Sequence, residues 1–76
     1  SKTIRYLKNN KRSIRKKLSN FNSANIKRNL KNFGVTKIDY IELFNSKTLT
    51  RPRSNRENFK IFIAFYLNKT RLIDNI

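Results

Sequence analysis

The stretch KTRLIDN, residues 69–75, places Arg71 three residues before Asp74. Arginine binds carboxylates and phosphates through paired N–H donors, and aspartate can serve as an acid, a base or a metal ligand. The stretch pairs no nucleophile with a base, so it does not form an active site by itself. Its spacing fits a closing strand better, in which Arg71 and Ile73 share one face while Leu72 and Asp74 share the other.

The sequence has four acidic residues, which are Asp39, Glu42, Glu57 and Asp74. No two of them have the close spacing of a metal site or of an acid/base couple. We expect ion pairs instead, with Asp39 as the first candidate to hold Arg71. Histidine and cysteine are absent and glycine occurs once, which excludes the commonest general base, thiolate sites and a glycine-rich phosphate loop. We therefore assign no catalytic, cofactor-binding or metal-binding residue to this chain.

Two basic segments could bind phosphate. RPRSNR, residues 51–56, carries three arginines on one predicted loop, and residues 1–31 hold eleven lysines or arginines with no acid. The net charge of +15 would attract phosphates, nucleic acid or an acidic partner. A flexible surface loop and a solvated helix face are the alternatives. Residues 1–20 contain one aromatic residue, Tyr6. A nucleic-acid-binding module usually has more aromatic side chains on which bases can stack.

The basic segment must be carried by a helix, which we predict over residues 2–18. Its apolar residues recur at helical spacing on one side, with Lys11 interrupting the stripe; they are Ile4, Leu7, Ile14 and Leu18. A second helix is predicted over residues 23–33.

For the second helix, Asn22 provides an N-cap, and Ile26, Leu30 and Phe33 form one apolar stripe. Gly34 follows where a left-handed residue would close it.

Three strands should follow, over residues 36–44, 59–67 and 70–75. In the first, Ile38, Tyr40 and Phe44 would share one face, and Ile41 and Leu43 the other. The second is almost continuously apolar, which predicts a strand covered on both faces. Asn68 and Lys69 form a two-residue hairpin connection to the third. We therefore predict an α+β fold, with two N-terminal helices packed on a small three-stranded antiparallel sheet.

Seventy-six residues, 37% of them apolar, form at most one small domain with a modest core. No apolar run reaches the roughly 20 residues of a membrane span, and no signal peptide is expected because the first residues are polar and basic. We expect a cytoplasmic protein with no membrane partner.

Two of these strand segments resemble a known family. KIDYIELFNSKTL, residues 37–49, and KTRLIDNI, residues 69–76, look like the C-terminal end of pantothenate synthetase, also called pantoate–β-alanine ligase. The resemblance is detailed from about Gly34 onward. Asn68 stands where that family usually has glycine. The matching positions are Asp39, Tyr40, Glu42, Thr48, Leu49, Lys69, Thr70, Arg71, Leu72, Ile73, Asp74 and Asn75.

The resemblance implies an enzyme that condenses pantoate with β-alanine using ATP and Mg²⁺. The reaction passes through a pantoyl adenylate and releases AMP and pyrophosphate. Residues 1–76 would be its C-terminal lid domain, inactive alone and binding no cofactor alone. The partner would be an N-terminal nucleotidyltransferase domain that carries the catalytic motifs, in an enzyme expected to be a homodimer.

Composition alone leaves other functions open. The acid-free first 31 residues also fit a small basic nucleic-acid-binding module, and the charge also fits a domain that binds an acidic protein. The family resemblance does not favour a nucleic-acid partner.

Overall fold

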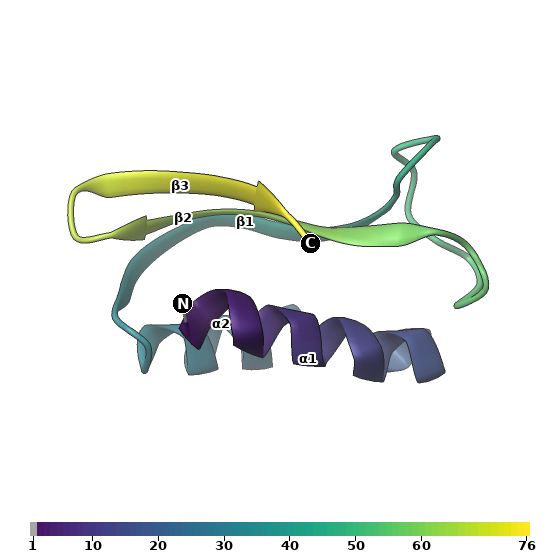
Figure 1. Ribbon diagram of the computed structural model, residues 1–76, viewed down its shortest axis with the longest axis horizontal. Helices are drawn as coiled ribbons and strands as arrows, with labels where there is room; N and C mark the ends of the chain where they lie inside the picture. The colour runs from purple at the N-terminus through teal and green to yellow at the C-terminus, as the bar shows by residue number, and fades with distance from the viewer. Residues whose placement is uncertain (1) are drawn as a thin grey trace.

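The computed structural model describes residues 2–76 and has two layers, with the helices lying along one face of a sheet (Figure 1). Two helices followed by a three-stranded antiparallel sheet confirm the predicted α+β fold. The elements in chain order are α1 (Lys2–Lys16), a 3₁₀ turn η1 (Leu18–Asn20), α2 (Ser23–Lys31), β1 (Val35–Asn45), β2 (Phe59–Leu67) and β3 (Thr70–Asn75).

Helix α1 ends at Lys16, two residues earlier than predicted, because side chains take over the carbonyl groups of its last turns. The Nδ2 atom of Asn55 donates to the carbonyl oxygens of Arg15 and Lys16, at 2.8 and 3.1 Å. Asn20 Nδ2 donates to Ser13 O at 2.8 Å. The chain leaves the helix at Lys17, whose backbone is extended. These hydrogen bonds satisfy three of the carbonyl groups at the helix end.

Helix α2 begins as predicted, with Oδ1 of Asn22 accepting a hydrogen bond from the Asn25 backbone N–H at 3.0 Å. Ile26 and Leu30 are buried. The prediction that Phe33 continues their stripe is wrong, because the helix ends at Lys31 and a turn leads to Gly34, whose φ is 92°. Phe33 is 36% exposed, and its ring centroid lies 5.4 Å from that of Tyr6 on α1.

The sheet has the strand order β1-β2-β3, and both strand pairs are antiparallel. Leu67 pairs with Thr70, so the predicted two-residue hairpin through Asn68 and Lys69 is confirmed. The register places Arg71 and Ile73 on one face of β3 and Leu72 on the other, as predicted.

A β-bulge at Asp39 changes the faces of β1. Ile38 pairs with Phe65, but Tyr40 pairs with Ala64, so β1 has one residue more than β2 between these pairs. Ile38 therefore packs against the core with Ile41, and the prediction that it shares a face with Tyr40 is wrong.

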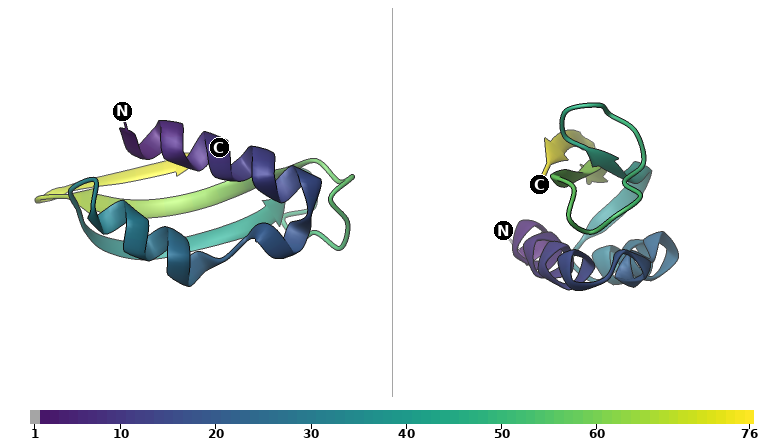
Figure 2. Two further views of the ribbon diagram at one scale, coloured as in Figure 1. Left: turned by 90° about the horizontal axis from the view of Figure 1, so that it is seen from below. Right: turned by 90° about the vertical axis from the view of Figure 1, so that its right-hand side faces the viewer.

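The core lies between the helices and the sheet, which are separate layers in the right-hand view of Figure 2. Helix α1 lies against β2, and α2 against β1. No described helix is long and apolar enough to cross a membrane. The buried apolar side chains that fill the core are those of Leu7, Ile14, Ile26, Leu30, Val35, Ile41, Leu43, Phe59, Ile61, Ile63 and Phe65.

The prediction that β2 is covered on both faces is wrong for this chain. Its inward residues Phe59, Ile61, Ile63 and Phe65 are buried under the helices. On its outer side only Ala64 is buried, whereas Phe62 and Tyr66 are partly exposed. Both helices lie on the other side, so the described residues provide no second layer over this face (Figures 1 and 2).

Candidate functional site

Arg71 and Asp39 form the ion pair that the sequence predicts. The Nε atom of Arg71 on β3 lies 2.9 Å from Oδ2 of Asp39 on β1, and Lys37 Nζ lies 3.6 Å from the other carboxylate oxygen. The hydrogen bond from Arg71 to Asp39 raises the pKa of the guanidinium. The pair thus stabilises the sheet, because the two side chains bind each other across its outer face.

Glu57 organises the loop between β1 and β2. Its Oε1 accepts from Asn45 Nδ2 at 2.9 Å, and its Oε2 accepts from the backbone N–H groups of Arg53 and Ser54 at 2.8 and 3.0 Å. These hydrogen bonds, led by that of Asn45, together with the charge of Arg53, lower the pKa of Glu57 below its ordinary value. The carboxylate therefore has a structural role, because the hydrogen bonds that it accepts hold the loop in one conformation.

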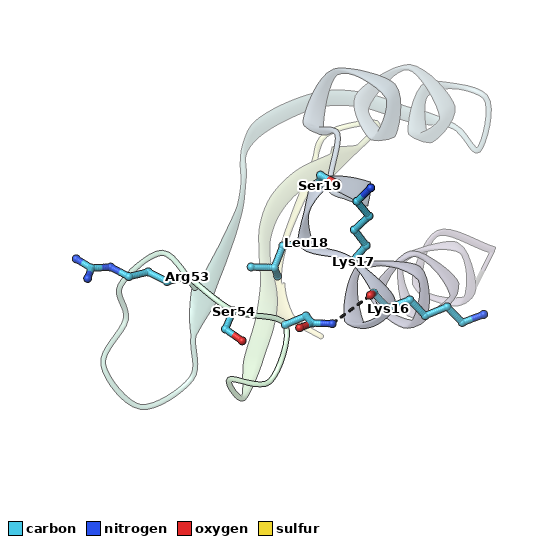
Figure 3. Close-up of a pocket in the computed structure, with 7 residues that line it drawn as sticks. Lys16, Lys17, Leu18, Ser19, Arg53 and Ser54 are labelled. Atoms are coloured by element: carbon cyan, nitrogen blue, oxygen red, sulfur yellow. Dashed lines mark hydrogen bonds between the residues drawn. The ribbon is translucent and has the colours of Figure 1, made fainter.

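One of the three arginines of this loop lines a hollow of the surface. Arg53 lines an open hollow of about 450 Å³ between the loop and the end of α1, together with Lys16 and Lys17. Figure 3 shows Arg53 pointing away from both lysines. Asn55 joins the loop to the end of α1 through the carbonyl of Lys16. The hollow thus offers no set of cations aimed at one point, and the loop is not a plain flexible one because Glu57 and Asn55 hold it.

The four acidic residues do not gather into a site. Glu57 lies in the loop, and Asp39 is paired with Arg71. Asp74 Oδ1 accepts from the backbone N–H of Asn75. Within residues 2–76, no group of three or more histidine, cysteine or acidic residues could hold a metal ion.

The strongest candidate for a functional surface is the outer face of the sheet, which the sequence did not reveal. We call it the open sheet face. Its apolar side chains come from all three strands; they are Tyr40, Phe44, Phe62, Tyr66 and Ile73. Tyr40 is 38% and Ile73 is 63% exposed. The rings of Phe44 and Phe62 meet edge to face, with centroids 5.5 Å apart.

Charged groups border the open sheet face. Lys37 Nζ lies 5.6 Å from the centroid of the Tyr66 ring, and the Asp39–Arg71 pair stands beside it. An apolar centre with a polar rim is the composition of a protein–protein contact surface. The alternation of β2 could have identified this face, and the sequence already places Tyr40 and Phe44 together on one side of β1.

Comparisons with known proteins agree on one family. The family profile described as Pantoate-beta-alanine ligase matches residues 1–76. The pantothenate synthetase of Enterococcus faecalis is 38% identical over 50 residues, which are 66% of this chain and 18% of that protein. The pantothenate synthetase of Clostridioides difficile is 37% identical over 60 residues, which are 74% of this chain and 21% of that protein.

No solved structure matches the chain. The chain spans about a fifth of the length of the curated relatives that it matches. The match to the family profile covers every residue, including the helical part for which the sequence motifs gave least detail. The chain therefore belongs to the pantoate-beta-alanine ligase family.

Proposed function

We propose that this chain is the C-terminal lid domain of a pantothenate synthetase. The full enzyme joins pantoate to β-alanine at the expense of ATP. The family match over residues 1–76 supports the activity, and the small share of each relative that the chain covers supports a part of a larger enzyme. The family is named as a ligase and both relatives as pantothenate synthetases, which gives no support to a nucleic-acid-binding module.

The open sheet face is the observation that carries the lid role. β2 has the near-continuous apolar sequence of a strand buried on both sides, yet the helices cover only one side of it. Tyr40, Phe62 and Ile73 lie on the uncovered side. In the proposal this face packs on the N-terminal nucleotidyltransferase domain, which removes its apolar area from water.

A lid of this kind acts by enclosing the reactants. In the proposed reaction the pantoate carboxylate attacks the α-phosphate of ATP and pyrophosphate leaves. The amine of β-alanine then attacks the acyl carbon and AMP leaves. Exclusion of water protects the acyl adenylate from hydrolysis and keeps the amine in attacking position. The lid needs no acid or base of its own for this role.

We assign ATP and Mg²⁺ to the N-terminal domain. The described part of this chain has no acidic cluster suited to the ion, which supports this assignment. Mg²⁺ would neutralise phosphate charge when bound. The family resemblance also leads us to propose a homodimeric enzyme in the cytoplasm.

The lid role can be tested by joining this chain to the N-terminal domain of a family member. We expect the joined protein to form pantothenate from pantoate, β-alanine and ATP, and the 76-residue chain alone to form none. The matched control is the same N-terminal domain without this chain, which should hydrolyse more ATP per pantothenate formed. Pantothenate formation by the chain alone, or no gain from joining, would contradict the proposal.

A further inference from the structure

Lys11 occupies a position that the fold would ordinarily give to an apolar residue. It lies four residues after Leu7 and three before Ile14, and both of those side chains are fully buried. Residues at this spacing share one face of a helix. The lysine that interrupts the stripe in the sequence is thus placed at the border of the core, and it is partly buried.

Lys11 lines a groove of about 510 Å³ between α1 and the edge of the sheet. Lys8, Arg12 and Arg15 line the same groove from α1, and Lys60 lines it from β2. Lys60 can reach it because the pairing of β2 with β3 ends at Phe62, and only the hydrogen bonds between Ile61 and Ile76 continue it. Cations therefore approach the groove from two elements.

Arg15 is held in place at one end of the groove. Its guanidinium carbon lies 4.9 Å from the centroid of the Phe59 ring, which is itself buried. A guanidinium at this distance is attracted to the face of an aromatic ring. The Phe59 ring thus favours a position of Arg15 at this end of the groove.

Within the described residues, no acidic side chain pairs with this group, although Ile76, the last residue of the chain, also lines the groove. Burial, followed by the charges of Arg15 and Lys60, lowers the pKa of Lys11. Within residues 2–76 both ion pairs belong to Asp39 on the opposite face of the sheet. Asp74 precedes the groove residue Asn75, but its carboxylate accepts the Asn75 N–H and pairs with no cation of the groove. The concentrated positive charge is an electrostatic cost that a bound anion would relieve.

We propose that this groove binds a short linear phosphate chain, such as tripolyphosphate or the triphosphate of a nucleotide. Lys8 and Arg15 lie about 10 Å apart along the helix axis, a span that suits several linked phosphates. Arginine supplies paired donors to phosphate oxygens, and lysine supplies point charges. The groove residues include no aromatic side chain, so the site lacks the stacking platform of single-strand nucleic-acid binders.

This inference does not depend on the proposed ligase function. The groove lies beside α1 at the sheet edge, and most of its cations come from α1, whereas the open sheet face lies on the other side of the sheet. Lys60 alternates with the inward residues of β2 and is the one groove cation that borders both surfaces. A phosphate chain could be bound there while the open sheet face contacts another domain.

The test is a titration of the 76-residue chain with tripolyphosphate, ATP and orthophosphate, followed by calorimetry. The groove variant is Lys11→Gln/Arg15→Gln/Lys60→Gln. The control is Lys27→Gln/Arg28→Gln/Lys31→Gln on the exposed side of α2, which removes the same three charges. We expect the groove variant to bind tripolyphosphate about tenfold or more weakly, and the control roughly twofold at most. Equal weakening would overturn the proposal, because it would show attraction by net charge alone.

The ligand series separates the possible sources. Equal affinity for tripolyphosphate and ATP, with much weaker orthophosphate, would identify the phosphate chain itself as the ligand. Tighter binding of a DNA duplex than of tripolyphosphate at physiological salt would overturn the assignment in favour of nucleic acid. Amide shifts in the unmodified chain keep the test valid if a variant unfolds. They should change at Lys8, Lys11 and Lys60 and not along α2, and uniform changes would contradict the groove.

Discussion

The guanidinium of Arg71 reaches across the middle strand of the sheet to the carboxylate of Asp39, with 2.9 Å between Nε and Oδ2. β1 and β3 each pair with β2 and not with each other, so this contact joins the two outer strands directly. The bulge puts Asp39 in reach, since it supplies the extra residue between the pairs made by Ile38 and Tyr40. The pair thus fixes an irregular point of β1 against the end of the chain.

Arg71→Ala should lower the free energy of unfolding by a small amount, because the pair is partly exposed and screened by water. A double-mutant cycle with Asp39→Ala, measured by urea denaturation, should give a favourable coupling that shrinks as salt is added. Lys69→Ala is the control, as this lysine is exposed and outside both ion pairs. If Arg71→Ala leaves stability unchanged but weakens ATP binding in the full enzyme, Arg71 is a ligand contact instead.

Asn68 should be replaceable by glycine but not by alanine. Its φ of 58° lies in the left-handed region, which asparagine and glycine tolerate better than other residues. Asn68→Ala should cost about 1 kcal/mol in the free energy of unfolding, whereas Asn68→Gly should change it by a few tenths. Chemical denaturation of the three proteins checks this, and equal losses in both variants would mean that the asparagine side chain matters instead.

Glu57 should make the domain sensitive to acid. Its pKa in the folded state lies below the ordinary value of about 4.3. Above that pH the folded carboxylate contributes stability. As the pH falls through the ordinary value, the unfolded chain takes up a proton before the folded one does, so this contribution is lost.

Glu57→Gln should therefore be less stable than the unmodified chain at neutral pH, and the difference should shrink as the pH falls below about 4. Thermal unfolding at a series of pH values measures it. Glu42→Gln is the matched control, because Glu42 is exposed and lies outside this hydrogen-bonded loop. A difference that stays constant with pH would contradict the charge argument.

Ile73→Lys should separate docking from folding. The side chain is 63% exposed, so the free energy of unfolding of the 76-residue chain should change by about 0.5 kcal/mol or less. A buried lysine in the contact proposed for the open sheet face should reduce the ligase activity of the joined enzyme about tenfold or more. Asn25→Lys adds the same charge on the exposed side of α2 and should leave activity unchanged. Equal activity in both variants would remove this face from the contact.

Lys11→Leu should raise stability while it weakens phosphate binding. Leucine would complete the stripe between Leu7 and Ile14 and relieve the repulsion from Arg15 and Lys60. The gain should be about 1 kcal/mol, typical of a replaced functional residue. Urea denaturation and tripolyphosphate titration measure the two effects. A loss of stability would show that the lysine contributes to packing.

Local signals in the sequence predicted the elements, and long-range contacts decided their details. The Asn22 N-cap, the left-handed backbone of Gly34 and the Asn68 turn depend on neighbouring residues, so they could be predicted from residue type and position. Gly34 lies three residues after the end of α2 and does not close it directly as predicted. The bulge at Asp39 could not, because it exists only in the pairing of β1 with β2. Its omission placed Ile38 on the wrong face. The open sheet face was missed because β2 was expected to be covered on both sides.

The groove also combines a feature that the sequence shows with one that only the fold shows. The sequence revealed that Lys11 breaks an apolar stripe, but Lys60 is 49 residues later and only the fold brings it to α1. The pairing of Arg71 with Asp39 was predictable despite its distance in sequence, since the chain has so few carboxylates.

The strand order leaves both β1 and β3 as edges of the sheet, and each edge is a template on which another chain could add a strand. Fibrous aggregation by this route requires two copies to come into contact. Each copy carries a net charge of +15, so the copies repel each other. Lys37 and Arg71 stand on the outer strands themselves, where they oppose such a meeting at close range. The basic excess thus gives the domain colloidal protection that the sheet lacks, and this protection fades as ionic strength rises.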